Sequence, residues 1–295
     1  HGIQWGYEEN LGSNAYFYEM TSMWFEDILI PDGNDYLDGW ADDLLDDPTA
    51  DFDNTGSGYE LALFGHYLSS FLDPKGSDTA KNSTIIREMW ERYGSTSSNA
   101  FSSVEYVLEN NYDVSFIAVW ADFISRNLFN GIDDNFYYYG DQALIDPINT
   151  NPQSLDKPKS FTLQLDNESA AIESFRIGDL ESLITIKQGI ENFIGRVAIV
   201  STDNSEFNNL FWGSDPTLEE LFTLEESFNN AEVHFVYGID GSSITLPIEI
   251  TAHTVPLAPS NLMAVVAQDS IILSWNPSPG PGENLSYVVF RDNDS

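Results

Sequence analysis

The sequence has no cysteine among its 295 residues, so it can form neither disulfide bonds nor thiolate metal sites. A bound metal ion would have to be held by histidine nitrogens and by carboxylate or carbonyl oxygens. No apolar run approaches the roughly 20 residues that a membrane-spanning helix needs, so membrane insertion is not expected. The sequence begins with histidine and shows no signal peptide, which predicts that it is part of a longer protein.

Basic residues are scarce as well, because 11 Lys and Arg stand against 48 Asp and Glu, giving a formal net charge of −37. A field of this sign repels phosphate groups, so nucleic acids and anionic membranes are not expected as partners. Acids outnumber bases throughout the chain, which favours an acidic surface suited to high-salt water or divalent cations. The apolar content is nevertheless that of a folded protein, and the length allows two or three domains.

The first 130 residues are predicted to form an all-helical module, because their apolar residues recur with the period of an α-helix. Between residues 16 and 28, Phe17, Met20, Trp24 and Ile28 form an apolar stripe, while Glu19 and Glu26 fall on another face. Further helices are expected at 59–71, 83–93, 101–108 and 114–128.

Residues 131–157 are predicted to be a turn-rich connection that holds an aromatic patch, 136–139. Such a patch serves either to pack against a neighbouring domain or to bind a sugar. Residues 158–254 are predicted to form a β-sandwich, because they contain five runs of strand-forming residues. These runs are 161–165, 183–186, 196–200, 233–237 and 244–250.

The end of the chain, 255–295, resembles the opening of a fibronectin type III domain. The segments 259–264, 271–277 and 287–291 match its first three strands, and Trp275 corresponds to the core tryptophan. The resemblance implies a third, truncated sandwich, since an immunoglobulin-like sandwich takes about 100 residues. The fold class expected for the whole chain is therefore a multidomain α + β protein.

The segment from Tyr18 to Asp27, YEMTSMWFED, resembles a helix of the gluzincin metallopeptidases that reads Asn-Glu-Gly-Phe-Ala followed by an aromatic residue and an acid. It keeps the glutamate, Glu19, but has Met20 where the family often has glycine. Seventeen residues separate His1 from Glu19, which is close to the family's usual spacing. The resemblance covers about residues 1–130 and extends to a group of secreted bacterial metalloproteases with similar acid-rich and tyrosine-rich loops.

The resemblance implies a zinc site in which His1 and Glu19 are two of the ligands, with Glu19 pointing toward His1. The first histidine and the glutamate that acts as general base would lie upstream, in a His-Glu-x-x-His motif. Tyr59 falls in a segment similar to the family's Pro-Tyr-Glu-Lys-Gly helix, which implies that its hydroxyl stabilises the oxyanion. Glu26 and Asp27 are candidates to accept hydrogen bonds from the ligand imidazoles, or else to solvate the helix.

The implied protein is a secreted or cell-surface zinc metallopeptidase that hydrolyses polypeptides and works as a monomer, with this chain as an inactive fragment. The alternative is a non-catalytic adhesion protein that keeps the peptidase scaffold and uses β-sandwiches as spacers. A third reading, a carbohydrate-binding module, rests on 136–139 alone. A structural calcium ion is a further alternative at 51–56, although Ala62 occupies the position of the loop's bidentate glutamate. His66, His234 and His253 are not expected to be ligands.

Overall fold

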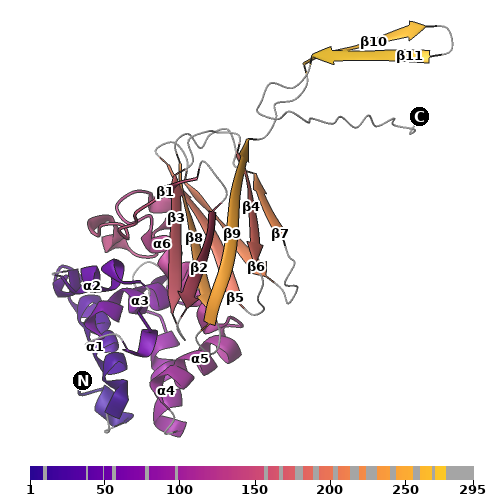
Figure 1. Cartoon of the computed structure of the whole chain (residues 1–295). Coiled ribbons are helices and arrows are strands. Elements are labelled where there is room, and N and C mark those ends of the chain that lie inside the picture. The colour runs from indigo at the N-terminus through magenta and orange to yellow at the C-terminus, as the bar shows by residue number, and fades with distance from the viewer. Residues whose placement is uncertain are drawn as a thin grey trace.

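The computed structural model describes the chain except for residues 9–11, 38, 49, 55–57, 77–79, 97–98, 156–158, 166–168, 177–181, 189–192, 202–204, 213–218, 224–230, 240–243, 255–259, 268–269 and 277–295. The described helices lie in the first half of the chain and the described strands in the second half (Figure 1). The mixed α and β composition expected from the sequence is therefore present.

Six α-helices are described in the first half: α1 (Ala15–Leu29), α2 (Trp40–Asp46), α3 (Ala62–His66), α4 (Ile85–Thr96), α5 (Ala100–Asn111) and α6 (Phe116–Asn127). The stretch expected as one helix over 59–71 is divided into a 3-10 turn (Tyr59–Leu61), α3 and a π-helical turn (Tyr67–Leu72). Helix α2 was not expected from its acid-rich sequence, but Asp42 and Asp43 lie in its first turn, where the helix dipole favours negative charge.

An aromatic cluster forms the centre of the helical core. Phe52 is fully buried although it sits between Asp51 and Asp53, and its ring lies 5.0 Å from the ring of Phe116 and 5.4 Å from that of Trp120. Aromatic rings at such separations add attraction beyond the apolar area that they bury. The acid-rich stretch before α3 is thus anchored by one apolar side chain.

The second half contains two larger sheets and a hairpin. One sheet has the order β1 (Gln153–Ser154), β3 (Ala170–Arg176), β8 (Glu232–Ile239), β5 (Phe193–Val200), β6 (Glu206–Trp212), and only β1 pairs in parallel. The other has the order β2 (Lys159–Leu165), β9 (Ile244–Thr254), β4 (Ser182–Gln188), β7 (Glu219–Thr223). All five expected strands are present, while β1, β3, β6 and β7 were not expected.

The hairpin of β10 (Ser260–Ala267) and β11 (Ser270–Asn276) corresponds to the first two strands of the fibronectin-like segment. Trp275 is partly buried, whereas Leu262 and Val266 are 68% and 77% exposed. The third expected strand, 287–291, lies outside the described residues.

Helix α6 packs against the five-stranded sheet, so the helical half and this sheet share one apolar core. Ala170, Ala198 and Val236 belong to the same buried cluster as the helices. At Gly238 an added Cβ would lie 2.7 Å from the side chain of Ile117, which shows how closely α6 approaches β8. The core therefore extends across the boundary expected near residue 158.

An ion-pair network joins α6 to this sheet. The Asp122 carboxylate contacts the Arg196 guanidinium from β5, and its Oδ2 also accepts hydrogen bonds from Arg126 Nε (2.7 Å) and the Tyr67 hydroxyl (2.6 Å). Burial lowers the pKa of Arg196 to about 10, but the group stays charged at neutral pH. A buried charge of this kind costs free energy unless an opposite charge nearby compensates for the lost water, and Asp122 supplies that charge to Arg196.

Replacing Asp122 by alanine should lower the free energy of unfolding by about 3–5 kcal/mol, because the Arg196 charge would be left in the core without its carboxylate. Urea unfolding measures this change. The control is Glu91→Ala, which breaks the exposed Arg87–Glu91 pair and should cost only about 0.5 kcal/mol. Equal effects of the two substitutions would contradict the role given to Asp122.

Candidate functional site

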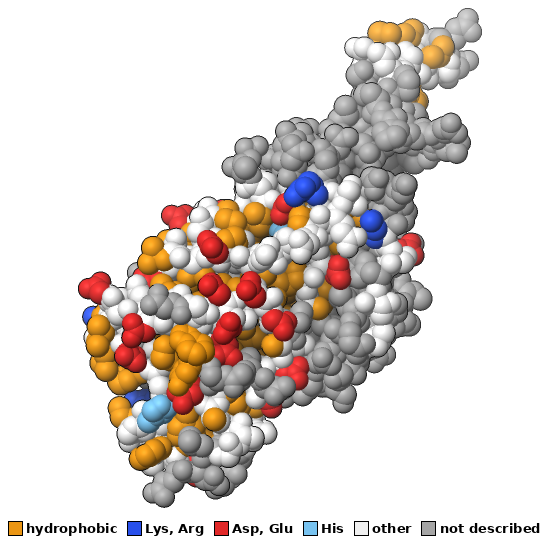
Figure 2. Space-filling model, turned by 60° about the vertical axis from the view of Figure 1, so that its left-hand side comes forward, with side chains coloured by type: hydrophobic (Ala, Val, Ile, Leu, Met, Phe, Trp, Pro, Cys, Tyr) orange, Lys and Arg blue, Asp and Glu red, His pale blue; other side chains and the backbone are white. Residues whose placement is uncertain are grey.

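A groove of about 830 Å³ runs along helix α1, and His1, Glu19 and Tyr59 all line it. Its apolar walls come from α1, from the N-terminal turn and from α4; they include Ile3, Met23, Phe25, Leu29, Ile86 and Trp90. Apolar side chains and carboxylates are interleaved on the face of the helical half shown in Figure 2. The three residues for which the family resemblance implies zinc binding and oxyanion stabilisation thus share one surface.

His1 and Glu19 lie in contact, with Nε2 of the imidazole 3.3 Å from Oε2 of the carboxylate. Both are accessible, since their side chains are 49% and 25% exposed. Glu19 therefore points toward His1, and the two groups form an ion pair when the imidazole is protonated. Among the described residues, no three His, Asp or Glu side chains meet in a group that could hold a metal ion. The pair alone could supply two ligands of a metal site, and a third ligand would have to come from outside the described residues.

Two residues behind His1 were not anticipated from the sequence. Ser22 Oγ lies 3.2 Å from Nδ1 of His1, on the ring edge away from Glu19, and 3.2 Å from Gln4 Oε1. Gln4 is buried, and its amide nitrogen also contacts α1. No local pattern could have found this contact, because 18 positions separate Gln4 from Ser22.

Tyr59 is placed by the backbone that precedes it. Gly58 has a φ of +85°, and a Cβ there would lie 2.3 Å from the carbonyl oxygen of Tyr16 in α1. The Tyr59 ring lies edge-on to Trp40, with centroids 4.9 Å apart. The negative charge of Glu19 is the main cause that raises the pKa of the Tyr59 hydroxyl, which keeps this group a proton donor beside the carboxylate.

The structure brings Asp27 to His66 rather than to His1. Asp27 lies two turns beyond Glu19 on α1, about 12 Å along the helix axis, and its Oδ2 is 3.4 Å from His66 Nε2. Both side chains are buried, and among the residues that the structure describes this nitrogen has no hydrogen-bond partner. Glu26 remains exposed at the edge of the groove.

Burial shifts the protonation of this pair in opposite directions. It lowers the pKa of His66 to about 3, so the imidazole is neutral. Burial, together with the nearby Asp141 charge, raises the pKa of Asp27 to about 6. The ring of His66 stacks on Tyr139 with centroids 4.4 Å apart, so each ring covers one face of the other.

Two residues of the aromatic patch 136–139 belong to the core, while Phe136 and Tyr137 are partly exposed. Tyr138 and Tyr139 are 4% and 8% exposed, and the Tyr138 hydroxyl donates to Asn127 Oδ1 at 3.0 Å. Stacking on a sugar requires an exposed ring face, which these two tyrosines do not offer.

The candidate calcium loop at 51–56 lies partly outside the described residues, and so does the side chain of His253. His234 is buried in β8, 2.8 Å from Ser174 Oγ.

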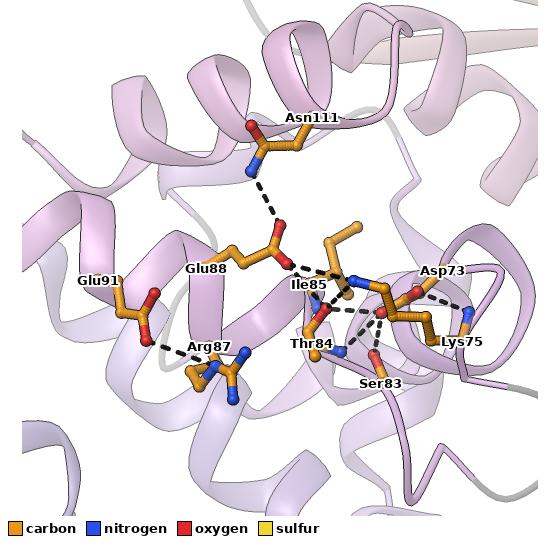
Figure 3. A network of polar contacts seen from close by, with 9 residues as sticks. All are labelled: Asp73, Lys75, Ser83, Thr84, Ile85, Arg87, Glu88, Glu91 and Asn111. Atoms are coloured by element: carbon orange, nitrogen blue, oxygen red, sulfur yellow. Dashed lines mark hydrogen bonds and ion pairs between the residues drawn. The ribbon is translucent and has the colours of Figure 1, made fainter.

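A polar network holds the α4 wall of the groove in place (Figure 3). The Asp73 carboxylate accepts hydrogen bonds from the backbone N–H of Thr84 (2.7 Å) and Ile85 (3.1 Å), at the start of α4, and from Ser83 Oγ (2.9 Å). Burial alone would raise the pKa of Asp73, but these hydrogen bonds prevail and lower it. Asp73 thus caps the helix that carries Ile86 and Trp90 into the groove.

No family model matches this sequence, and a comparison with curated proteins found no match either. One similar solved structure is PliG, a periplasmic inhibitor of g-type lysozyme from Salmonella Typhimurium, at 8% identity and a TM-score of 0.26, over 35% of this chain and 99% of that one. Two others come from infectious bursal disease virus. They are the Gx strain structure (11% identity, TM-score 0.18, 33% of this chain and 31% of that one) and the VP2 subviral particle (9%, 0.19, 37% and 33%). Similarity this low carries no argument, so function has to be argued from the site.

Asp27 should make stability depend on pH in a defined direction. Its folded-state pKa of about 6 lies above the ordinary 3.8, so the folded protein binds the proton more tightly, and this contribution to stability is lost as pH rises from about 4 to 6. Asp27→Asn should remove that contribution, measured by urea unfolding at several pH values. Glu26→Gln, on the exposed side of α1, should leave the wild-type slope unchanged. Identical slopes for Asp27→Asn and the wild type would refute the assignment.

Gly58→Ala should destabilise the protein much more than Gly39→Ala. Both glycines have positive φ, +85° and +95°, but only at Gly58 does an added Cβ meet backbone atoms. Gly39→Ala should therefore cost about 1–2 kcal/mol, the conformational penalty alone, while Gly58→Ala adds a steric clash with α1. Thermal or urea unfolding measures both. Equal losses would mean that Tyr59 is not positioned by this contact.

Proposed function

We propose that this chain is part of a secreted or cell-surface zinc metallopeptidase that hydrolyses peptide bonds. The observation that carries the proposal is the meeting of His1, Glu19 and Tyr59 at one groove, in the order and spacing that the gluzincin resemblance implies. The exposed apolar side chains of the groove, such as Ile3 and Leu29, suit an extended polypeptide. The resemblance also implies a monomer.

The donor set fits zinc. An imidazole nitrogen and a carboxylate oxygen are ligands that zinc takes in catalytic sites, which keep three protein ligands and one open position. His1 Nε2 and Glu19 would be two of these ligands, with a histidine upstream as the third. A bound zinc ion supplies a Lewis acid for peptide-bond hydrolysis.

Within this chain, each residue then has a defined task. His1 and Glu19 hold the metal, and the apolar walls bind the substrate side chains and exclude water. Tyr59, with its proton retained beside Glu19, donates a hydrogen bond to the oxyanion that develops on the scissile carbonyl. The general base is assigned to the upstream glutamate, so the chain alone is expected to be inactive.

The proposal is tested on a protein lengthened upstream by its native residues. Zinc should bind to it and casein should be cleaved, and Glu19→Gln should lower kcat/KM more than about 100-fold because a metal ligand is lost. Tyr59→Phe should lower kcat by about 100-fold or more with little change in KM. Glu26→Gln is the control for a change of charge on the same helix.

Two results would refute the assignment as a zinc peptidase. One is the absence of both zinc binding and cleavage by the lengthened protein, and the other is full activity after Glu19→Gln. Either result would favour the competing class, a non-catalytic adhesion protein that keeps the scaffold. The upstream sequence distinguishes the peptidase from the adhesion protein, because the peptidase requires His-Glu at the fourth and third positions before His1.

A further inference from the structure

We propose that Asp27, Pro31, Asn34 and Asp141 form a calcium site, where the loop that follows α1 meets the connection between α6 and the sheets. The site lies apart from the groove residue Glu19, because Asp27 is two turns further along α1, about 12 Å along the helix axis. The proposal goes beyond the peptidase and does not depend on zinc. Three observations carry it: oxygens that converge on one amide, carboxylates that no basic side chain neutralises, and a buried nitrogen that faces one of them.

Three oxygens converge on the side-chain amide of Asn34. One polar atom of this amide lies 3.1 Å from Asp141 Oδ2, 3.2 Å from Asp27 Oδ1 and 3.3 Å from the carbonyl oxygen of Pro31. If that atom is the nitrogen, its two hydrogens satisfy at most two of the three acceptors. If it is the oxygen, four oxygens crowd together, and a cation between them would remove their repulsion. Oxygens that bind one calcium ion at about 2.3–2.6 Å lie roughly 3 Å from their neighbours, so these separations suit a shared ion.

The two carboxylates lack a compensating positive charge. Among the residues that the structure describes, neither Asp27 nor Asp141 forms an ion pair with a lysine or an arginine. Asp27 is 8% exposed, so water screens its charge poorly. The Tyr36 hydroxyl lies 3.4 Å from Asp141 Oδ2, which supplies a hydrogen bond but no charge. A divalent cation would neutralise both carboxylates at once.

His66 gives an independent indication on the other side of Asp27. Its Nε2 is buried, has no hydrogen-bond partner within the described part of the chain and lies 3.4 Å from Asp27 Oδ2. Burial keeps this imidazole neutral by lowering its pKa, so it does not supply the missing positive charge. Because Oδ2 of Asp27 faces His66 while Oδ1 faces Asn34, one oxygen of the carboxylate is left for the ion.

Calcium suits these donors better than zinc or magnesium. Two carboxylates, a backbone carbonyl and a side-chain amide are all oxygen ligands, which calcium takes in sets of about six to eight. A cavity of about 210 Å³ is lined by Asp27 and Asn34 and has room for water molecules that complete such a set. Magnesium requires a smaller octahedral shell and keeps more of its water. Only two ligands are carboxylates, which agrees with the absence of a group of three His, Asp or Glu side chains from the described residues.

Thermal unfolding of this chain, first treated with a chelator and then supplied with calcium, tests the site. At free calcium about 100 times above its Kd, the Tm should rise by roughly 5 °C, because the ion binds only the folded state. Asp27→Asn and Asp141→Asn should each abolish this rise. Asp134→Asn is the matched control, since it removes a charge from the same connection but is exposed and makes none of these contacts.

In chelator, Asp141→Asn should melt no lower than the wild type, because one of two repelling charges is gone, so a lost calcium response cannot be attributed to misfolding. The pH dependence predicted for Asp27 is likewise measured in chelator. Three results overturn the proposal: no response of the wild type to calcium, a response that persists in both Asp27→Asn and Asp141→Asn, or an equal response to magnesium. None of them bears on zinc binding by His1 and Glu19, so the proposed function is tested separately.

Discussion

Helix α1 is held at a fixed depth between α3 and α4, and the candidate site depends on this constraint. The ring of Trp24 lies so close to Gly65 that a Cβ there would come within 2.9 Å of it. On the other side, the ring of Trp90 stacks on Phe17 with centroids 4.6 Å apart. Because these contacts prevent α1 from shifting along its axis, its polar residues have fixed positions. Glu19 faces the groove, Thr21 faces Gln4, and Asp27 faces His66.

Much of the fold could be predicted from the sequence where a single periodicity dominates. The helices at 83–93, 101–108 and 114–128 have apolar residues on one face, and the structure places α4, α5 and α6 there. Strand β3 was missed because its pattern does not alternate: Ala170 and Ala171 are both buried, since both sides of that strand are covered. Helix α2 was missed because its apolar stripe, Ala41, Leu44 and Leu45, spans only one turn of a helix of 7 residues within an acid-rich stretch.

The candidate site could be predicted only where the sequence spacing between two residues could be compared with the spacing in a known family. His1 and Glu19 followed from such a spacing. Gln4 and Ser22 carry no pattern, because their contacts with each other and with His1 join positions far apart in the sequence. The Asp27–His66 contact joins residues whose positions in space are set by the packing of α1 on α3, and sequence spacing contains no information about that packing.

The shared core of α6 and the five-stranded sheet has a consequence for how the protein melts. Because Ile117 fills the space over Gly238 and Asp122 binds Arg196 across the same boundary, the helices cannot separate from the strands without exposing both the apolar surface and the charge. The two halves should therefore lose structure in a single cooperative transition. A chain cut after residue 130 would keep the groove but lose the surface that supports it from behind.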